Sequence, residues 1–197
     1  MDISRRQLLG SAVALTATSI FAPPALAAGG GKELFATARA GLERMGRRVI
    51  HHDYVGVADF SNPSRKLRFH VLDMAGGKKS SLLVAHGRGS DPGHLGWVQR
   101  FSNDFGSNAT SNGAYLTGDY YTGKHGRSMR LQGMDPTNCH AEARAIVVHG
   151  AWYVGPEMIR EHGKLGRSEG CFAFAESDLD QVLTQLGPGR LLIAGKF

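Results

Sequence analysis

The chain has 197 residues, about the size of one domain, of which 42% are hydrophobic and 20% charged, and this composition argues against an intrinsically disordered protein. It contains 27 glycines while aromatic residues make up 8%, which indicates many turns and short elements rather than long helices. The net charge is +6, but the sequence has no basic run and no nucleic-acid motif, so nucleic acid is not expected as a partner.

The first 27 residues are predicted to be a twin-arginine export signal. Residues 4–6 read Ser-Arg-Arg, a mild apolar run follows at 11–22, and residues 25–27 read Ala-Leu-Ala, a small-residue cleavage site. The apolar run is too short to span about 30 Å of hydrocarbon. We therefore expect a periplasmic or cell-envelope protein with no membrane anchor once the signal is cleaved.

The rest of the chain is predicted to consist of an N-terminal helix with its lead-in, 28–53, and one main domain, 54–197. Apolar residues recur at helical spacing from Glu33 to Met45, and Gly46 is placed to end that helix. No internal repeat or second domain boundary is visible.

Beyond residue 53 the pattern changes to short apolar or alternating runs bounded by turn residues, which predicts strands. These are expected at 54–60, 67–71, 81–85, 113–117, 129–131, 145–149 and 191–193. A helical turn at 135–143 and a helix capped by Ser177 interrupt them. The pattern predicts a mainly β fold with a few short helices, and the polar stretch 86–112 has the length of a functional or lid-like loop.

One segment combines the residue types that nucleophilic catalysis needs. The β-branched run 146–148 leads into His149 and Gly150, and Cys171 lies 22 residues after His149. A thiol, with a free pKa of about 8.5, becomes a good nucleophile when an imidazole takes its proton. A carbonyl such as that of Gly150 can fix the imidazole tautomer. We therefore interpret the segment as the centre of a Cys–His acyl-transfer enzyme.

The residues before the cysteine, Ser168-Glu169-Gly170, are predicted to form a tight turn. Successive backbone amides in such a turn can converge on a developing oxyanion, and one such donor is worth about 2.7–4 kcal/mol. The alternative for Cys171 is a disulfide with Cys139, the second of the two cysteines, although two cysteines in a chain of this length do not make a disulfide scaffold.

The segment resembles the signature of the murein L,D-transpeptidase catalytic-domain family, which reads His-Gly, a loop, then Ser-His-Gly-Cys. It is most similar to the branch whose second motif is Gly-Arg-Ser-x-Gly-Cys, found here at 166–171. The resemblance covers about Val55 to Ile193. The preceding matches, in order, are Phe-Ser-Asn at 101–103, Gly-Ser at 106–107, Tyr-Thr-Gly-Lys-His-Gly at 121–126, Met-Arg-Leu-Gln-Gly at 129–133, and the stretch 138–146.

The resemblance implies a β-sandwich with Cys171 as nucleophile, His149 as general base and the Gly150 carbonyl as the group that orients the imidazole. It also implies that the amides of Glu169, Gly170 and Cys171 form the oxyanion hole. The substrate would be a peptidoglycan stem peptide, whose terminal D-Ala is released as a thioester forms. An amine would then accept the acyl group in a transpeptidase, and water would accept it in an L,D-carboxypeptidase. A catalytically inactive peptidoglycan-binding protein of the same fold is the third possibility.

The sequence departs from the main family at two positions near the cysteine. Glu169 replaces a histidine two positions before it, and Ala173 replaces Asn or Arg two positions after it. These changes leave the Cys–His pair intact but leave the acceptor open.

Four further residues are expected to bind substrate, because they lie in the matched motifs or carry a guanidinium that suits carboxylates: Arg167, Ser168, His125 and Tyr121. The scattered histidines show no HExxH pattern, so we expect neither a metal site nor a cofactor. The protein is expected to act as a monomer.

Overall fold

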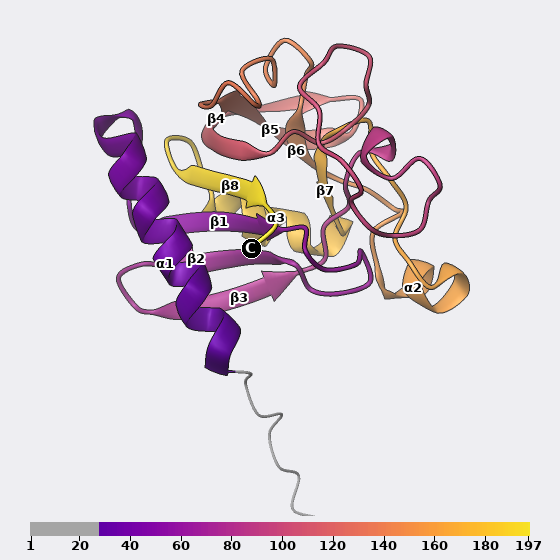
Figure 1. Cartoon of the computed structure of the whole chain (residues 1–197), viewed down its shortest axis with the longest axis horizontal. Coiled ribbons are helices and arrows are strands. Elements are labelled where there is room, and N and C mark those ends of the chain that lie inside the picture. Colours follow the sequence, from indigo (N-terminus) through magenta and orange to yellow (C-terminus); the bar gives the residue numbers. More distant parts are fainter. Residues whose placement is uncertain (1–27) are drawn as a thin grey trace, which may run out of the picture.

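The computed structural model describes residues 28–197, and the predicted export signal, 1–27, lies outside them. Eight strands pair in the order β3-β2-β1-β8-β4-β5-β6-β7, and α1 lies across the half of the sheet that contains β1 and β2 (Figure 1). The elements are α1 (Ala28–Met45), η1 (Gly46–Arg48), β1 (Tyr54–Asp59), β2 (Phe69–Asp73), β3 (Lys78–Leu82), η2 (Arg88–Ser90), β4 (Gly113–Gly123), β5 (Gly126–Gly133), β6 (Val147–Gly150), α2 (Pro156–His162), β7 (Phe172–Phe174), α3 (Glu176–Gln185) and β8 (Leu191–Gly195).

The sheet is strongly curved, so that its two ends approach each other across the core. The rings of Phe69 on β2 and Phe174 on β7 lie 4.7 Å apart, although five strands separate β2 from β7 in the pairing order. Ala85, just after β3, forms an antiparallel bridge with Ala173 on β7. The expected mainly β fold is thus confirmed, and its two layers are the halves of one continuous sheet.

The main core fills the space inside this curved sheet. It contains buried side chains from both halves and from one face of α3, including Val71, Met129, Phe172 and Leu183. Burial of large apolar side chains is the dominant stabilising contribution to a core of this kind. The main core therefore fixes β6 and β7, which carry the candidate site, relative to the rest of the molecule.

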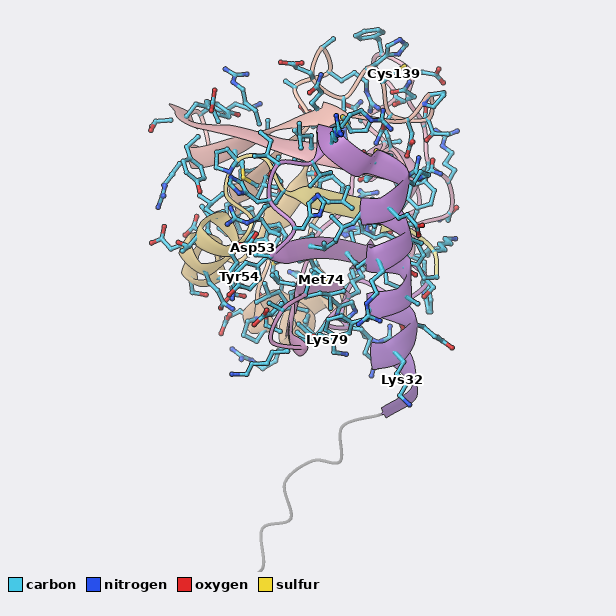
Figure 2. The ribbon with its side chains drawn as sticks, turned by 90° about the vertical axis from the view of Figure 1, so that its left-hand side faces the viewer. Lys32, Asp53, Tyr54, Met74, Lys79 and Cys139 are labelled. Atoms are coloured by element: carbon cyan, nitrogen blue, oxygen red, sulfur yellow. The ribbon has the colours of Figure 1, made fainter. Side chains whose placement is uncertain are left out.

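A second core lies between α1 and the outer face of the sheet (Figure 2). Leu34 and Ala38 of α1 are buried there with Val57 of β1 and Ile193 of β8. A Cβ built on Gly41 would come within 2.5 Å of Ile193 Cδ1, so the absence of a side chain at Gly41 allows the helix to approach the sheet. No helix within residues 28–197 is both long and apolar enough to cross a bilayer.

Several boundaries differ from the sequence-based expectations. The first helix begins at Ala28 instead of Glu33, and β3 ends at Leu82, whereas the pattern predicts a strand over 81–85. Residues 136–145 form turns without a helix. Ser177 is not the N-cap of α3, since Ala175 occupies that position and no side chain caps the helix. Neither α2 nor β7 is predicted by the sequence patterns.

Candidate active site

Two adjacent strands bring His149 and Cys171 to the same place. Strands β6 and β7 are parallel, with His149 opposite Ala173. Side chains alternate along a strand, and Cys171 lies two residues before Ala173, which puts it on the His149 side, roughly 7 Å further back along the strand direction. Both residues line one cavity of about 500 Å³.

The His149 imidazole is buried and is held by its neighbour. Its Nδ1 lies 2.8 Å from the Gly150 carbonyl oxygen, which places the ring proton on Nδ1 and leaves Nε2 able to accept a proton. Burial lowers the pKa of His149 to about 4, the hydrogen bond to Gly150 opposes this shift, and the nearby His125 and Lys124 add to it. At neutral pH His149 is therefore uncharged. The contact with Gly150 is the one that a carbonyl-oriented general base requires.

The Cys171 side chain is a free, half-buried thiol. Its Sγ lies 3.6 Å from the Ala145 carbonyl oxygen. Burial raises the pKa of Cys171, while the Val147 N–H and the charges of Lys124 and Arg144 oppose that rise. Cys139 is also free, and it is exposed, so the two cysteines are not joined in a disulfide.

The turn that carries Cys171 is organised by the Ser168 hydroxyl. Ser168 Oγ donates to the Cys171 carbonyl at 2.7 Å and accepts from the Gly170 N–H at 3.2 Å. Gly170 has φ +123°, and a Cβ there would lie 2.9 Å from the Ala109 carbonyl oxygen. A residue with a side chain is strained in that backbone region, so glycine is needed at this position.

The loop before β4, residues 86–112, is hydrogen-bonded to the turn that carries Cys171. The Ser168 N–H donates to the His86 carbonyl at 2.9 Å, and the Ser168 carbonyl accepts from the Arg88 N–H at 2.8 Å. Thr110 Oγ1 donates to the Gly170 carbonyl at 3.2 Å. The long polar stretch 86–112 therefore packs beneath the cysteine turn and holds its backbone.

The four expected substrate-binding residues all line the cavity, but they have different partners within the protein. Ser168 is almost fully buried, and its hydroxyl is used inside the turn. Arg167 donates to the carbonyl oxygens of Asp91 and Pro92. The Tyr121 ring lies 4.6 Å below the Arg130 guanidinium. The His125 ring stacks on that of His149, with centroids 4.1 Å apart and planes inclined by 17°.

Sequence reasoning did not single out several residues that line the same cavity. Arg144 is tied to the loop through the Ala109 and Ser102 carbonyls, at 2.6 and 2.8 Å; its only sequence signal is its place in the matched stretch 138–146. No group of three or more potential metal ligands occurs within residues 28–197. The other unanticipated lining residues are Lys124, Ala145, Val147 and Tyr153.

The solved structures to which the chain is similar include several L,D-transpeptidases. An L,D-transpeptidase from Mycobacterium smegmatis is 13% identical, with a TM-score of 0.43, and the alignment covers 73% of this chain and 58% of that one. One from Mycobacterium tuberculosis H37Rv is 18% identical, with a TM-score of 0.43 and the same coverage. The helical cell shape determining protein Pgp2 from Campylobacter jejuni is 12% identical, with a TM-score of 0.47, covering 82% of this chain and 55% of that one.

The chain thus spans less than two thirds of the length of these structures. No curated protein matches it significantly. The sequence profile of the L,D-transpeptidase catalytic domain matches residues 28–194, which is most of the chain. The match begins where α1 begins, so it takes in the helix as well as the sheet. On this match, the chain belongs to the L,D-transpeptidase catalytic domain family.

Proposed function

We propose that the chain is an exported cysteine acyl-transferase that acts on peptidoglycan stem peptides as an L,D-transpeptidase. The observation that carries the proposal is the arrangement of Cys171 and His149 in one cavity, with the imidazole oriented by the Gly150 carbonyl. Lys124, Arg144 and Arg167 line that cavity together with Glu169, and Glu169 is itself paired with Arg88 at 3.0 Å. The local excess of positive charge suits a substrate that carries carboxylates.

In the proposed reaction His149 takes the proton of the Cys171 thiol as the sulfur attacks the carbonyl carbon before the terminal D-Ala. The amides of Glu169 and Cys171 stabilise the oxyanion, since the Gly170 N–H is already bonded to Ser168. The intermediate collapses with cleavage of the C–N bond, the D-Ala amine leaves with the proton from His149, and a thioester remains on Cys171. An amine then attacks the thioester and restores the thiol.

Acylation of the thiol is the direct test. The purified protein is incubated with a carbapenem and weighed intact, and we expect one adduct per chain. Cys171→Ala should abolish the adduct, while Cys139→Ala, which removes the exposed thiol, should leave it unchanged. His149→Ala should slow acylation on the order of 10²- to 10⁴-fold. An adduct that survives Cys171→Ala, or no adduct on the wild-type protein, would contradict the proposal and favour a non-catalytic binding protein.

The acceptor is tested separately with a tetrapeptide donor and a stem peptide that carries a free amine. We expect a cross-linked product in which the donor has lost D-Ala. Release of free tripeptide alone would identify water as the acceptor and the protein as an L,D-carboxypeptidase.

A further inference from the structure

A second imidazole lies directly beside the candidate base. His125 occupies the two-residue turn between β4 and β5, where Gly123 pairs with Gly126, and its ring stacks on that of His149 at 4.1 Å. The His149 side chain is 1% exposed, whereas that of His125 is exposed. A molecule that arrives from solvent can therefore reach the His125 ring. The His149 ring, on which His125 stacks, is buried.

His125 also separates two cavities. The cavity that holds Cys171 shares Lys124, His125 and Tyr153 with a second cavity of about 420 Å³. The second cavity is lined in addition by Glu176 and by Trp152, whose side chain is 77% exposed. Glu176 and the Trp152 ring attract a cation, whereas Lys124 in the same lining repels one. An ammonium group would therefore approach along the part of this cavity formed by Glu176 and Trp152.

An amine acceptor has to lose more protons during the reaction than water does. An alkylamine is an ammonium ion at neutral pH, so it must lose one proton before its nitrogen can attack and a second one as the amide forms. Water loses a single proton as it attacks. His149, after it has returned its proton to the departing D-Ala amine, can accept one proton in the second half of the reaction. The other proton goes to solvent before the amine binds, or to a second base beside the thioester, and a base in the site makes the abundant ammonium form usable.

We infer that His125 is a second catalytic base, which takes the first proton from an ammonium acceptor entering through the Trp152 and Glu176 cavity. The inference rests on the proposed function. In the step it describes, the ammonium gives one proton to His125, and the nitrogen lone pair forms the C–N bond with the thioester carbon. The nitrogen passes its second proton to His149, the C–S bond breaks, and the Cys171 thiolate takes that proton. His125 then releases its proton to solvent.

The surroundings of His125 are compatible with this role. Burial and the charge of Lys124 lower the pKa of His125, while Glu169 opposes them, so the ring is uncharged at neutral pH and has a nitrogen free to accept a proton. The other titratable groups that share its two cavities are His149, Tyr121, Tyr153, Arg144, Arg167, Cys171 and Glu176.

The hairpin that carries His125 is also fixed in place. Tyr120 donates to the Leu183 carbonyl of α3 at 2.7 Å, and Arg127 pairs with Asp180 of α3 at 2.9 Å. The Tyr120 hydrogen bond anchors the hairpin to α3, and the exposed Arg127–Asp180 pair adds a weaker contact on the second strand.

The test compares two variants and two acceptors. His125→Phe keeps an aromatic ring against His149 but removes the base, and His125→Gln removes the ring. One acceptor is a stem-peptide amine, which is protonated at neutral pH; the other is hydroxylamine, which is largely uncharged there. His140→Phe is the matched control, because His140 is an exposed histidine stacked on another ring, that of Phe105, and it lines neither cavity.

In His125→Phe we expect the rate of transfer to the stem-peptide amine, divided by the rate of transfer to hydroxylamine, to fall on the order of 10²-fold, and the rate of carbapenem acylation to fall by a much smaller factor. His125→Gln should show the same selective loss, and His140→Phe no loss. An unchanged ratio of the two acceptors in His125→Phe, or a parallel fall in acylation and transfer, would overturn the inference. So would a wild-type enzyme that is acylated but releases only tripeptide. Failure of the wild-type protein to be acylated at all would instead refute the proposed function.

Discussion

At the scale of single residues, the pKa of Cys171 is raised by burial and that of His149 is lowered by burial to about 4. A thiolate–imidazolium pair would require the opposite order, with the thiol more acidic than the imidazolium. The resting pair is therefore a neutral thiol and a neutral imidazole, and in the proposed reaction proton transfer would accompany the attack of the sulfur on the substrate. In this respect the site differs from cysteine enzymes whose thiol ionises well below pH 7.

This charge state predicts two different pH profiles, to be measured in a Cys139→Ala background. Alkylation of Cys171 by iodoacetamide, which needs the thiolate, should be slow at pH 7 and should rise only above the pKa of a free thiol, about 8.5. Acylation by a carbapenem, which under the proposed mechanism would use His149 as base, should persist at acid pH and fall only as His149 becomes protonated, near pH 4. Rapid alkylation that continues down to about pH 5 would indicate a preformed ion pair instead.

Gly170 supplies a second prediction at this scale. Gly170→Ala should destabilise the protein by about 1–3 kcal/mol, because the backbone has a positive φ there and the Ala109 carbonyl is close. It should also reduce acylation, because it displaces the turn that carries Cys171 and the proposed oxyanion-binding amides. Urea unfolding and the acylation rate measure the two effects.

The control for this change is Gly163→Ala. Gly163 also has a positive φ, +71°, but no atom lies within 4 Å of the place that an added Cβ would take. It should share only the backbone strain, about 1 kcal/mol, with acylation unaffected. Equal loss of acylation in the two variants would show that the tight contact under the cysteine turn is unimportant.

At the scale of elements, the sequence is most informative where hydrophobic runs are local. The run 146–148 predicts a buried strand ending at His149, and β6 confirms this. The patterns do not predict β7 because it has only three residues, and its pairing with β6 defines it more than its own pattern does. The helical turn expected at 135–143 is present as a series of hydrogen-bonded turns over 136–145 that do not join into a helix. The Asn138 side chain bonds to the Asp135 N–H and the Ala114 carbonyl, a local competition that disfavours helix.

The buried polar network beneath the site could not be predicted, because its members come from separate segments with no common period. The Arg68 guanidinium donates to His86 Nδ1 at 2.7 Å, and His86 Nε2 lies 3.5 Å from the Asp91 carboxylate. Asp91 is fully buried and accepts the N–H groups of Leu95 and Gly96 at 2.8 and 2.7 Å. Since the Asp91 carbonyl also accepts Arg167, the network connects the core to the motif that carries Cys171.

Removal of the Asp91 carboxylate should therefore lower the stability of the whole fold, and not only that of the loop that carries Asp91. In Asp91→Ala the Leu95 and Gly96 amides, the first part-buried and the second buried, lose their acceptor. Arg68 also loses one of its two nearby carboxylates, with Asp59 remaining, so we expect a loss of about 3–5 kcal/mol in the free energy of urea unfolding. Asp73 makes the same kind of bond, to the Ala75 and Gly76 amides at 3.1 and 2.7 Å, but in an exposed turn. Asp73→Ala should cost about 1 kcal/mol, and similar losses in the two variants would contradict the proposed importance of burial.

At the scale of the whole molecule, α1 belongs to the same packed structure as the sheet. Its side chains share a buried cluster with β1 and β8, and the family match also begins at residue 28. The helix is predictable from its period, but 28–53 is expected as a helix and lead-in set apart from the main domain at 54–197, since a periodic apolar face does not reveal which surface will cover it. The close approach at Gly41 is visible only once Ile193, 152 residues later, is placed beside it.

The whole molecule is also expected to be sensitive to acid because it buries three neutral histidines. Burial lowers the pKa of His70 and of His149 to about 4, and burial together with Arg68 lowers that of His86. A histidine whose pKa is lower in the folded state than its unfolded value of about 6.5 stabilises the fold fully above pH 6.5, and this contribution is lost as the pH falls toward the folded pKa.

We therefore expect the free energy of urea unfolding to fall between pH 6.5 and 4.5, with His70 and His149 each contributing on the order of 2 kcal/mol and His86 acting in the same direction. Asp53, Asp91 and Asp135, whose pKa values are lowered below 3.8, act below this window. His70→Gln should reduce the slope by about a third, because it removes one of three proton-binding sites, whereas the exposed His162→Gln should leave it unchanged. A flat free energy across this range would mean that the buried rings gain protons without unfolding, and the neutral His149 proposed as general base would then be in doubt as well.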